Sequence, residues 1–146
     1  MIETEYSLRS PSTDEEWLAF HTIRRKVLFV NRGKNDYTEN HPDDFKTGNH
    51  PLILIYRGDV IGVVRIDVSE GEAWLRRVAI RDDLQRLGHG RVLIHLAEVF
   101  AMHEGCNEMR SNAATEAVGF YERCGYVCDT STRSPQNSVT MCKSVP

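Results

Sequence analysis

The segment Gln85-Arg86-Leu87-Gly88-His89-Gly90-Arg91 contains the residues whose types and spacing point most clearly to chemistry. It lies between an apolar stretch ending at Ile80 and a run with helical periodicity, 91–104. Two glycines at a helix start let the backbone approach an anion closely, and the unpaired first-turn amides point toward it with the helix dipole. The segment therefore predicts a phosphate cradle at a helix N-terminus.

The cradle does not match the two best-known nucleotide motifs. No Gly-Lys-Ser/Thr follows it, so it is not a P-loop, and Leu93 occupies the position of the third glycine of a dinucleotide fingerprint. Nucleotide hydrolysis and hydride transfer are therefore disfavoured. A purely structural turn remains the alternative for a Gly-x-Gly taken by itself.

The cradle must be positioned by strands before it and a helix after it. Apolar runs separated by tight turns predict a three-stranded antiparallel meander over 52–56, 60–68 and 73–80. After the helix, 107–112 is a candidate strand, and the order strand, helix, strand implies a parallel crossover. A short helix over 117–123 and strands over 126–129 and 138–143 complete an α+β fold with a mixed sheet.

The N-terminal part predicts a capped helix and then a long irregular segment. Residues 10–16 contain hydroxyl residues followed three positions later by Glu15 or Glu16, which predicts a capping box. An apolar face should follow, formed by Trp17, Phe20, Ile23, Val27 and Val30. Residues 31–51, rich in turn formers, predict a long loop or irregular helix, and loops of this length often carry function. His103 is expected to be partly buried on the helix after the cradle.

Composition narrows the class of protein. The 146 residues fit one domain, 1–146, and 18 basic against 21 acidic residues give a net charge of −3, which argues against a nucleic-acid partner. The longest purely apolar run, 52–56, is too short to cross a bilayer, and the acidic start, residues 1–5, argues against a signal peptide. We therefore expect a cytoplasmic protein without a membrane partner, as a monomer or a homodimer.

The cysteines and histidines predict neither a disulfide framework nor a metal site. The four cysteines form no Cys-x-x-Cys pair and are expected to be buried thiols, with a redox role for Cys124 and Cys128 as the alternative. The six histidines show no metal-ligand spacing. We expect no structural metal.

Two segments resemble a known family. The run 75–80 followed by Gln85–Gly90 resembles the acetyl-CoA-binding motif, Gln/Arg-x-x-Gly-x-Gly/Ala, of the GNAT superfamily of N-acyltransferases. Asn112-Ala113 followed by 117–126 resembles its second cofactor segment, in the same order along the chain. The resemblance implies a single-domain GNAT-like fold with a mixed, mostly antiparallel sheet flanked by helices, and acetyl-CoA as the cofactor.

The resemblance also implies roles for individual residues. The cradle backbone would hold the pyrophosphate of CoA, and the amide of Val78 or Ala79 would face the thioester carbonyl. Asn112 would contact the cofactor arm, and Tyr121 would lie near the sulfur as a general acid or hydrogen-bond donor. The implied cofactor-binding residues are Val78, Ala79, Ile80, Gln85, Arg86, Leu87, Gly88, His89, Gly90, Arg91, Asn112 and Tyr121.

The residues that receive the acceptor and its proton are less defined. Some GNAT enzymes carry a glutamate on the strand before the cradle, where this chain has Arg76 and Arg77. The remaining candidates for a general base are Glu39, His41, Asp43, Asp44 and Glu72, and we take Glu39 and Asp43, with Tyr121, as the predicted catalytic residues. The anionic cluster of Asp36, Glu39, Asp43 and Asp44 favours a cationic amine acceptor, whereas Arg76 could instead orient a substrate carboxylate.

The sequence thus predicts an N-acetyltransferase. An acetyl group would pass directly, in a ternary complex, from acetyl-CoA to a primary amine of a small molecule or peptide. The alternative is a CoA-binding module that senses or regulates without turnover.

Overall fold

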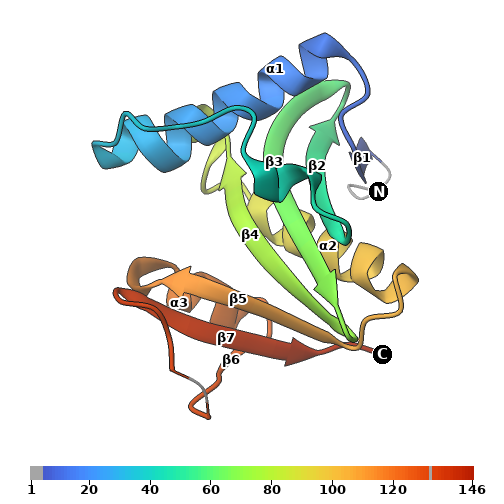
Figure 1. Ribbon diagram of the computed structural model, residues 1–146, viewed down its shortest axis with the longest axis vertical. Helices are drawn as coiled ribbons and strands as arrows, with labels where there is room; N and C mark the ends of the chain where they lie inside the picture. The colour runs from blue at the N-terminus through green and yellow to red at the C-terminus, as the bar shows by residue number, and fades with distance from the viewer. Residues whose placement is uncertain (1–4, 132) are drawn as a thin grey trace.

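A seven-stranded mixed sheet forms the centre of the computed structural model, which describes residues 5–131 and 133–146 (Figure 1). The strand order is β1-β2-β3-β4-β5-β7-β6. The β4–β5 pair is parallel and the other neighbouring pairs are antiparallel, which confirms the predicted sheet. The strands are β1 (Tyr6–Arg9), β2 (Asn49–Tyr56), β3 (Asp59–Ser69), β4 (Glu72–Ile80), β5 (Glu108–Ala114), β6 (Val127–Cys128) and β7 (Ser138–Ser144).

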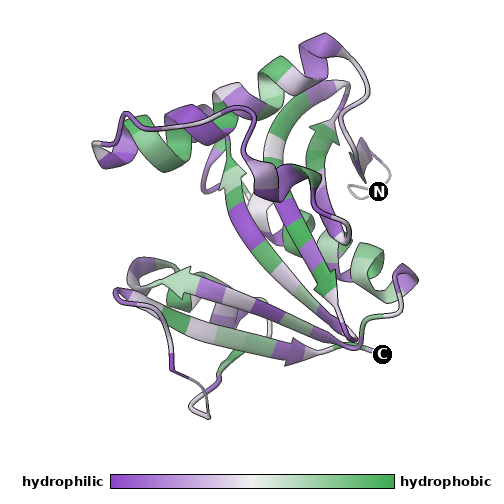
Figure 2. Ribbon diagram, viewed as in Figure 1, coloured by the Kyte–Doolittle hydropathy of each residue, from purple (hydrophilic) through white to green (hydrophobic). Residues whose placement is uncertain are grey.

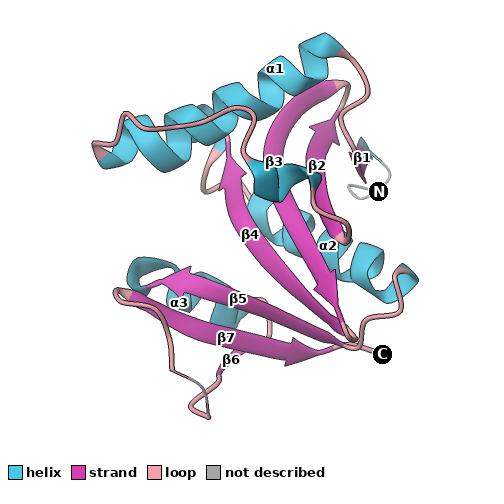
Figure 3. Cartoon of the chain, viewed as in Figure 1, coloured by secondary structure: helices cyan, strands magenta, loops and turns pink. Residues whose placement is uncertain are grey.

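Helices cover both faces of the sheet, α1 (Asp14–Ile23) on one and α2 (His89–His103) on the other, and α3 (Val118–Arg123) packs near β5 and β7 (Figure 3). The two-residue period of a strand explains this division. Leu52 and Leu54 of β2 pack in the core that contains α2, whereas Ile53 between them packs in the smaller core under α1. Figure 2 shows hydrophilic and hydrophobic residues interspersed along the strands.

Strands β4 and β5 diverge halfway along their length. They pair only from Glu72 opposite Glu108 to Leu75 opposite Ser111, whereas β5 pairs with β7 along its whole length, from Glu108 to Ala114. The strands therefore separate like the arms of a V (Figure 1). A β-bulge lies in β4 where this opening begins, because Arg77 and Val78 together face Val64, between the pairs Val63–Ala79 and Arg65–Arg76.

The N-terminal helix begins as predicted but changes geometry. The Thr13 hydroxyl accepts a hydrogen bond from the Glu16 amide at 3.1 Å, the first half of a capping box. After α1 the chain continues as a π-helix, Arg24–Phe29, and a 3₁₀ turn, Val30–Arg32. The wider π turn rotates the apolar face, so Leu28 is buried and Val30 is 53% exposed, and the prediction of Val30 on the core face was wrong.

Several smaller features refine or differ from the sequence prediction. Strand β1 was not predicted. The segment predicted as a long loop or irregular helix, 31–51, contains a 3₁₀ turn at Pro42–Phe45 and overlaps the start of β2. His103 is exposed, because Ala97 and Ala101 form the buried face of this part of α2. The four cysteines are free thiols, but only Cys106 is buried, whereas Cys124 and Cys142 are half-buried and Cys128 is exposed. Residues 1–4 of the acidic start, and residue 132 in a polar turn, lie outside the described residues.

In the described part of the chain, no helix is both long and apolar enough to span a bilayer.

Candidate active site

A cleft of about 680 Å³ opens where β4 and β5 separate. Its walls include the π-helix after α1, the diverging strands β4 and β5, α3, and the turn before β7. Val78 of β4, Asn112 of β5 and Tyr121 of α3 all line it. The structure therefore brings together the residues for which the family resemblance implied contact with the cofactor arm.

The bulge in β4 distinguishes the three predicted strand positions. Val78 lines the cleft, whereas Ala79 packs in the core under α1 and Ile80 in the core that contains α2. Because Val78 lies within the bulge, it is outside the regular pairing of β4 with β3. Of the two amides proposed for the thioester carbonyl, that of Val78 fits better.

Tyr121 is a buried phenol at the base of this cleft, only 5% exposed. Burial raises its pKa, and a hydrogen bond with Ser111 opposes this effect. Asn112 has its side-chain oxygen fixed, because Oδ1 accepts a hydrogen bond from the Thr140 hydroxyl at 2.9 Å. The amide group of Asn112 is thereby held in one orientation at the cleft wall.

The predicted cradle lies at the N-terminus of α2. Gly88 is the N-cap residue in the left-handed region, with φ +93°, and no side chain caps the first amides. A Cβ at Gly88 would meet no atom within 4 Å, whereas one at Gly90 would lie 3.2 Å from the Phe120 ring of α3. Gly88 thus faces open space, and Gly90 lets α3, which contributes Tyr121 to the cleft, pack against the first turn of α2.

Other cradle residues support this conformation rather than point into the cleft. The side-chain Nε2 of Gln85 donates a hydrogen bond to the Ile80 carbonyl at 3.0 Å, which connects the loop to the end of β4. His89 is 8% exposed, and its Nδ1 lies 2.7 Å from the Tyr6 hydroxyl, so His89 anchors α2 to β1. Arg86, Leu87 and Arg91 are exposed beside the uncapped amides.

These features fit the CoA moiety of acetyl-CoA. A helix of 15 residues presents uncapped amides next to a glycine with open space, as a diphosphate requires. The splayed strands provide an adjoining channel for an extended arm, at whose end the thioester would lie beside Val78 and Tyr121.

The two predicted carboxylate catalysts do not line this cleft. Glu39 is exposed and forms an ion pair with Arg25 at 2.9 Å. Asp43 pairs with Lys46 at 2.9 Å, and this hydrogen bond lowers the pKa of Asp43. Of the predicted catalytic residues, the structure therefore places only Tyr121 at the cleft, because the ion pairs hold the other two on the outer side of the 31–51 segment.

Three members of the anionic cluster predicted there, Glu39, Asp43 and Asp44, pair with basic side chains. Asp44 is buried, 4% exposed, and accepts hydrogen bonds from both terminal nitrogens of Arg24 at 2.9 and 3.1 Å. Arg65 of β3 approaches the same carboxylate at 3.5 Å. Asp44 therefore joins the π-helix after α1 to the sheet rather than facing a ligand.

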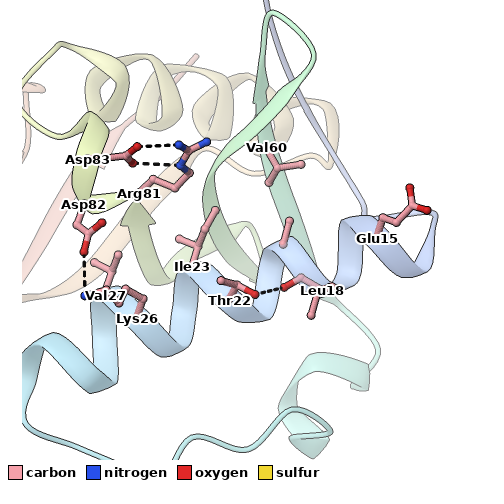
Figure 4. Close-up of a pocket in the computed structure, with 11 residues that line it drawn as sticks. Glu15, Leu18, Thr22, Ile23, Lys26, Val27, Val60, Arg81, Asp82 and Asp83 are labelled. Carbon is pink, nitrogen blue, oxygen red and sulfur yellow. Dashed lines mark hydrogen bonds and ion pairs between the residues drawn. The ribbon is translucent and has the colours of Figure 1, made fainter.

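A second groove lies between α1 and the residues that follow β4 (Figure 4). Four of its five charged side chains are paired: Arg81 donates two hydrogen bonds to Asp83, and Lys26 lies 3.4 Å from Asp82, while Glu15 is exposed. Thr22 donates its hydroxyl to the Leu18 carbonyl of its own helix. The groove lies outside the cleft between the strands.

The sequence interpretation missed Arg77 as a cleft residue. Arg77 lines the cleft with φ +54°, in the bulge. Arg77 was noted only as part of the pair that replaces a glutamate, and Arg76 rather than Arg77 was the candidate for orienting a substrate carboxylate. The available signal was the two adjacent arginines, because side chains in a regular strand alternate between the two faces and two neighbouring charged residues suggest an irregularity.

A sheet that opens beside a glycine-started, uncapped helix agrees with the GNAT-like fold that the sequence resemblance implied. The model of the Acetyltransferase (GNAT) family matches residues 17–126. The chain belongs to this family.

The individual relatives and solved structures described next share less than 30% sequence identity with this chain. A Bacillus subtilis (strain 168) protein whose name places it among the acetyltransferases is 29% identical over 105 residues, covering 70% of this chain and 71% of the relative. An acyl-CoA N-acyltransferase from Pseudomonas aeruginosa has a TM-score of 0.78 at 20% identity, covering 94% of this chain and 97% of the other. The spermidine N-acetyltransferase from Vibrio cholerae, solved with CoA and spermine, has a TM-score of 0.75 at 16% identity, covering 97% and 96%. These structural similarities concern the fold.

Proposed function

We propose that this protein transfers an acetyl group from acetyl-CoA directly to a primary amine. The observation that carries the proposal is the juxtaposition of two features: the uncapped α2 terminus at Gly88, and the cleft where Val78 and Tyr121 lie between separated strands. Family membership supports the same reaction class.

Each part of the site has a role in this proposal. Acetyl-CoA supplies an activated acetyl thioester when bound. The α2 amides around Gly88 bind the diphosphate, and the bulge positions the Val78 amide to donate a hydrogen bond to the acyl oxygen, where negative charge develops during transfer.

Tyr121 acts in this proposal as a hydrogen-bond donor to the departing sulfur. Burial raises its pKa above the ordinary value near 10, so the phenol keeps its proton at neutral pH. A thiol has a pKa of about 8.5, so complete proton transfer from this phenol to a thiolate is unfavourable. The phenol lowers the energy of the leaving group while it retains its own proton.

The acceptor's proton needs a different destination from the predicted Glu39 and Asp43. Glu116, which follows β5, contributes an exposed carboxylate to the cleft wall. We assign to Glu116 the role of accepting the proton, because it has access both to the cleft and to solvent.

The experiment compares glycines at the two ends of α2. Gly88 and Gly105 both have positive φ, +93° and +86°, and a Cβ at either meets nothing within 4 Å, so a side chain causes similar backbone strain at both. We expect Gly88→Val to weaken acetyl-CoA binding about tenfold or more in calorimetry, and Gly105→Val to bind like the wild type. Equal binding by all three proteins would disprove the cradle.

Turnover is tested separately, by detecting CoA release with a thiol reagent in the presence of varied primary amines. We expect amine-dependent release by the wild type. Tight binding of acetyl-CoA without release for any amine would contradict catalysis and leave a binding module.

A further inference from the structure

Arg77 contributes a cation to the cleft wall and has no ion-pair partner among the described residues. Its Nη1 atom is buried and has no hydrogen-bond partner there, and its guanidinium lies 5.6 Å from the centre of the ring of Phe29, which also lines the cleft. Burial, and then the nearby charge of Arg24, lower the pKa of Arg77. A buried donor without an acceptor costs free energy. A ligand that supplies an acceptor atom to this guanidinium would remove that cost.

Asp44, whose charge acts on Arg77, is already bound by other arginines. It is held by Arg24 and lies 3.5 Å from Arg65, and Arg65 also holds Asp67 at 2.7 Å. Arg76 approaches Asp67 at 3.5 Å. Three arginines thus share these two carboxylates, and among the described residues Arg77 forms no ion pair with either.

The rim of the cleft adds to the positive charge. Arg32 and Lys34, which follow the π-helix, line the cleft with Arg77, and Glu116 offsets one of these charges. A cationic acceptor would therefore meet like charges, whereas an acceptor with an anionic group would gain from them.

We propose that the physiological acceptor is a small amine that also carries a carboxylate, and that the Arg77 guanidinium binds this carboxylate. The inference rests on the proposed function and names its substrate class. The neutral amine nitrogen forms a bond to the acetyl carbon while the carbon–sulfur bond breaks, and the proton lost from nitrogen balances the one that the CoA sulfur gains. Arg77 holds the carboxylate and so limits the directions from which the amine can approach.

The adjacent arginine provides a matched control. The Arg76 guanidinium stacks on Trp74, 4.6 Å from the ring centre, and faces Asp67. Arg76 is on the same strand with the same charge, but it has partners within the protein. Arg76→Gln therefore changes the net charge by as much as Arg77→Gln does, without removing the proposed contact.

The first test uses pairs of amines that differ by one carboxylate: phenylalanine and phenethylamine, histidine and histamine, ornithine and putrescine, with spermidine as a polycation. We expect wild-type kcat/KM to be about tenfold or more higher for the carboxylated member of the best pair. Arg77→Gln should remove this preference mainly through KM, Arg77→Lys should restore part of it, and Arg76→Gln should preserve it. Acetyl-CoA affinity, measured by calorimetry, should be the same in all four proteins. Preference for spermidine or the decarboxylated amines, unchanged in Arg77→Gln, would overturn the inference and leave the proposed function standing.

The second test does not depend on turnover. The CoA-loaded protein is titrated with 3-phenylpropionate, a carboxylate without an amine, and with its neutral amide, by calorimetry. We expect saturable binding of the carboxylate by the wild type and Arg76→Gln, at least tenfold weaker binding by Arg77→Gln, and no binding of the amide. Equal affinity of the wild type and Arg77→Gln, or no carboxylate binding by the wild type, would overturn the inference whether or not an acceptor has been found. Failure of the proposed function differs, because acetyl-CoA then does not bind or no amine releases CoA.

Discussion

Two regions of the molecule, the cofactor side of the cleft and a charged side outside it, are built by different means. On the cofactor side, the proposed recognition depends on main-chain groups: the uncapped amides of α2, the left-handed Gly88 and the bulge at Val78. On the charged side, Asp44 of the 31–51 segment links Arg24 to Arg65 of β3, and none of these three residues lines the cleft. The comparison teaches that one side needs particular backbone conformations, while the other needs a particular balance of charges.

This difference separates stability from binding. The charged network joins the helical layer to the sheet, so its loss should damage the fold before it damages chemistry. The main-chain site depends on few side chains, so substitutions there should alter binding or turnover while the protein remains folded. Three predictions test this separation.

The largest effect is expected from Asp44→Ala, on the charged side. Both partners of the Arg24–Asp44 pair are almost fully buried, with side chains 0% and 1% exposed, so the variant leaves an uncompensated buried guanidinium. We expect a loss of about 3–5 kcal/mol in the free energy of unfolding, measured with urea. Asp43→Ala, which removes a neighbouring carboxylate paired at the surface with Lys46, is the control and should change stability little. Similar losses for the two variants would contradict the structural role of the network.

A smaller effect, on rate, is expected from Tyr121→Phe on the cofactor side. The variant keeps the ring that packs in the core but loses the hydroxyl to which we assign the hydrogen bond to the leaving sulfur. We expect kcat to fall about 10-fold to 100-fold, the value of a hydrogen bond to a charged group, with little change in acetyl-CoA affinity. Unchanged kcat would remove Tyr121 from the reaction.

The smallest effect concerns pH and again the charged side. His21 is 9% exposed, its Nδ1 lies 2.6 Å from the Tyr37 hydroxyl, and burial lowers its pKa while Glu39 partly opposes this. The unfolded chain, with an ordinary pKa near 6.5, therefore binds this proton more readily than the folded one. The free energy of unfolding should fall as pH decreases from about 6.5 toward the lowered value.

The His21→Asn variant checks this prediction, because it should lack that part of the pH dependence in urea unfolding at pH 7.5, 6.5 and 5.5. The control His103→Asn alters an exposed histidine and should keep the wild-type slope. A slope that is the same in His21→Asn and the wild type would show that other groups cause it.

Local patterns predicted the elements of the cofactor side well. The meander, the glycine-started helix and the parallel crossover to β5 follow from alternation, turn residues and helical periodicity, which are properties of neighbouring residues. The Val30 prediction failed because a π-helix changes the number of residues per turn, and β1 was missed because four residues at a sheet edge carry too short a pattern.

The candidate site divides in the same way. The cradle and Tyr121 could be identified from short motifs, because backbone conformation there depends on glycines in one segment. Glu39 and Asp43 were chosen by charge alone, and the ion pairs that remove them from the cleft involve Arg25 and Lys46, whose geometry no motif specifies.

The sequence by itself determined that this chain forms a mixed sheet with a glycine-started helix and belongs to the GNAT family, because periodicity and local backbone freedom are encoded in adjacent residues. Only the tertiary structure decided which charges remain free. Asp44 and Asp67 are bound by Arg24 and Arg65, whereas Arg77, in the β4 bulge, lines the cleft without an ion-pair partner in the described part of the chain. Electrostatic balance depends on distances between segments far apart in the chain, and those distances exist only once the helices have packed on the sheet.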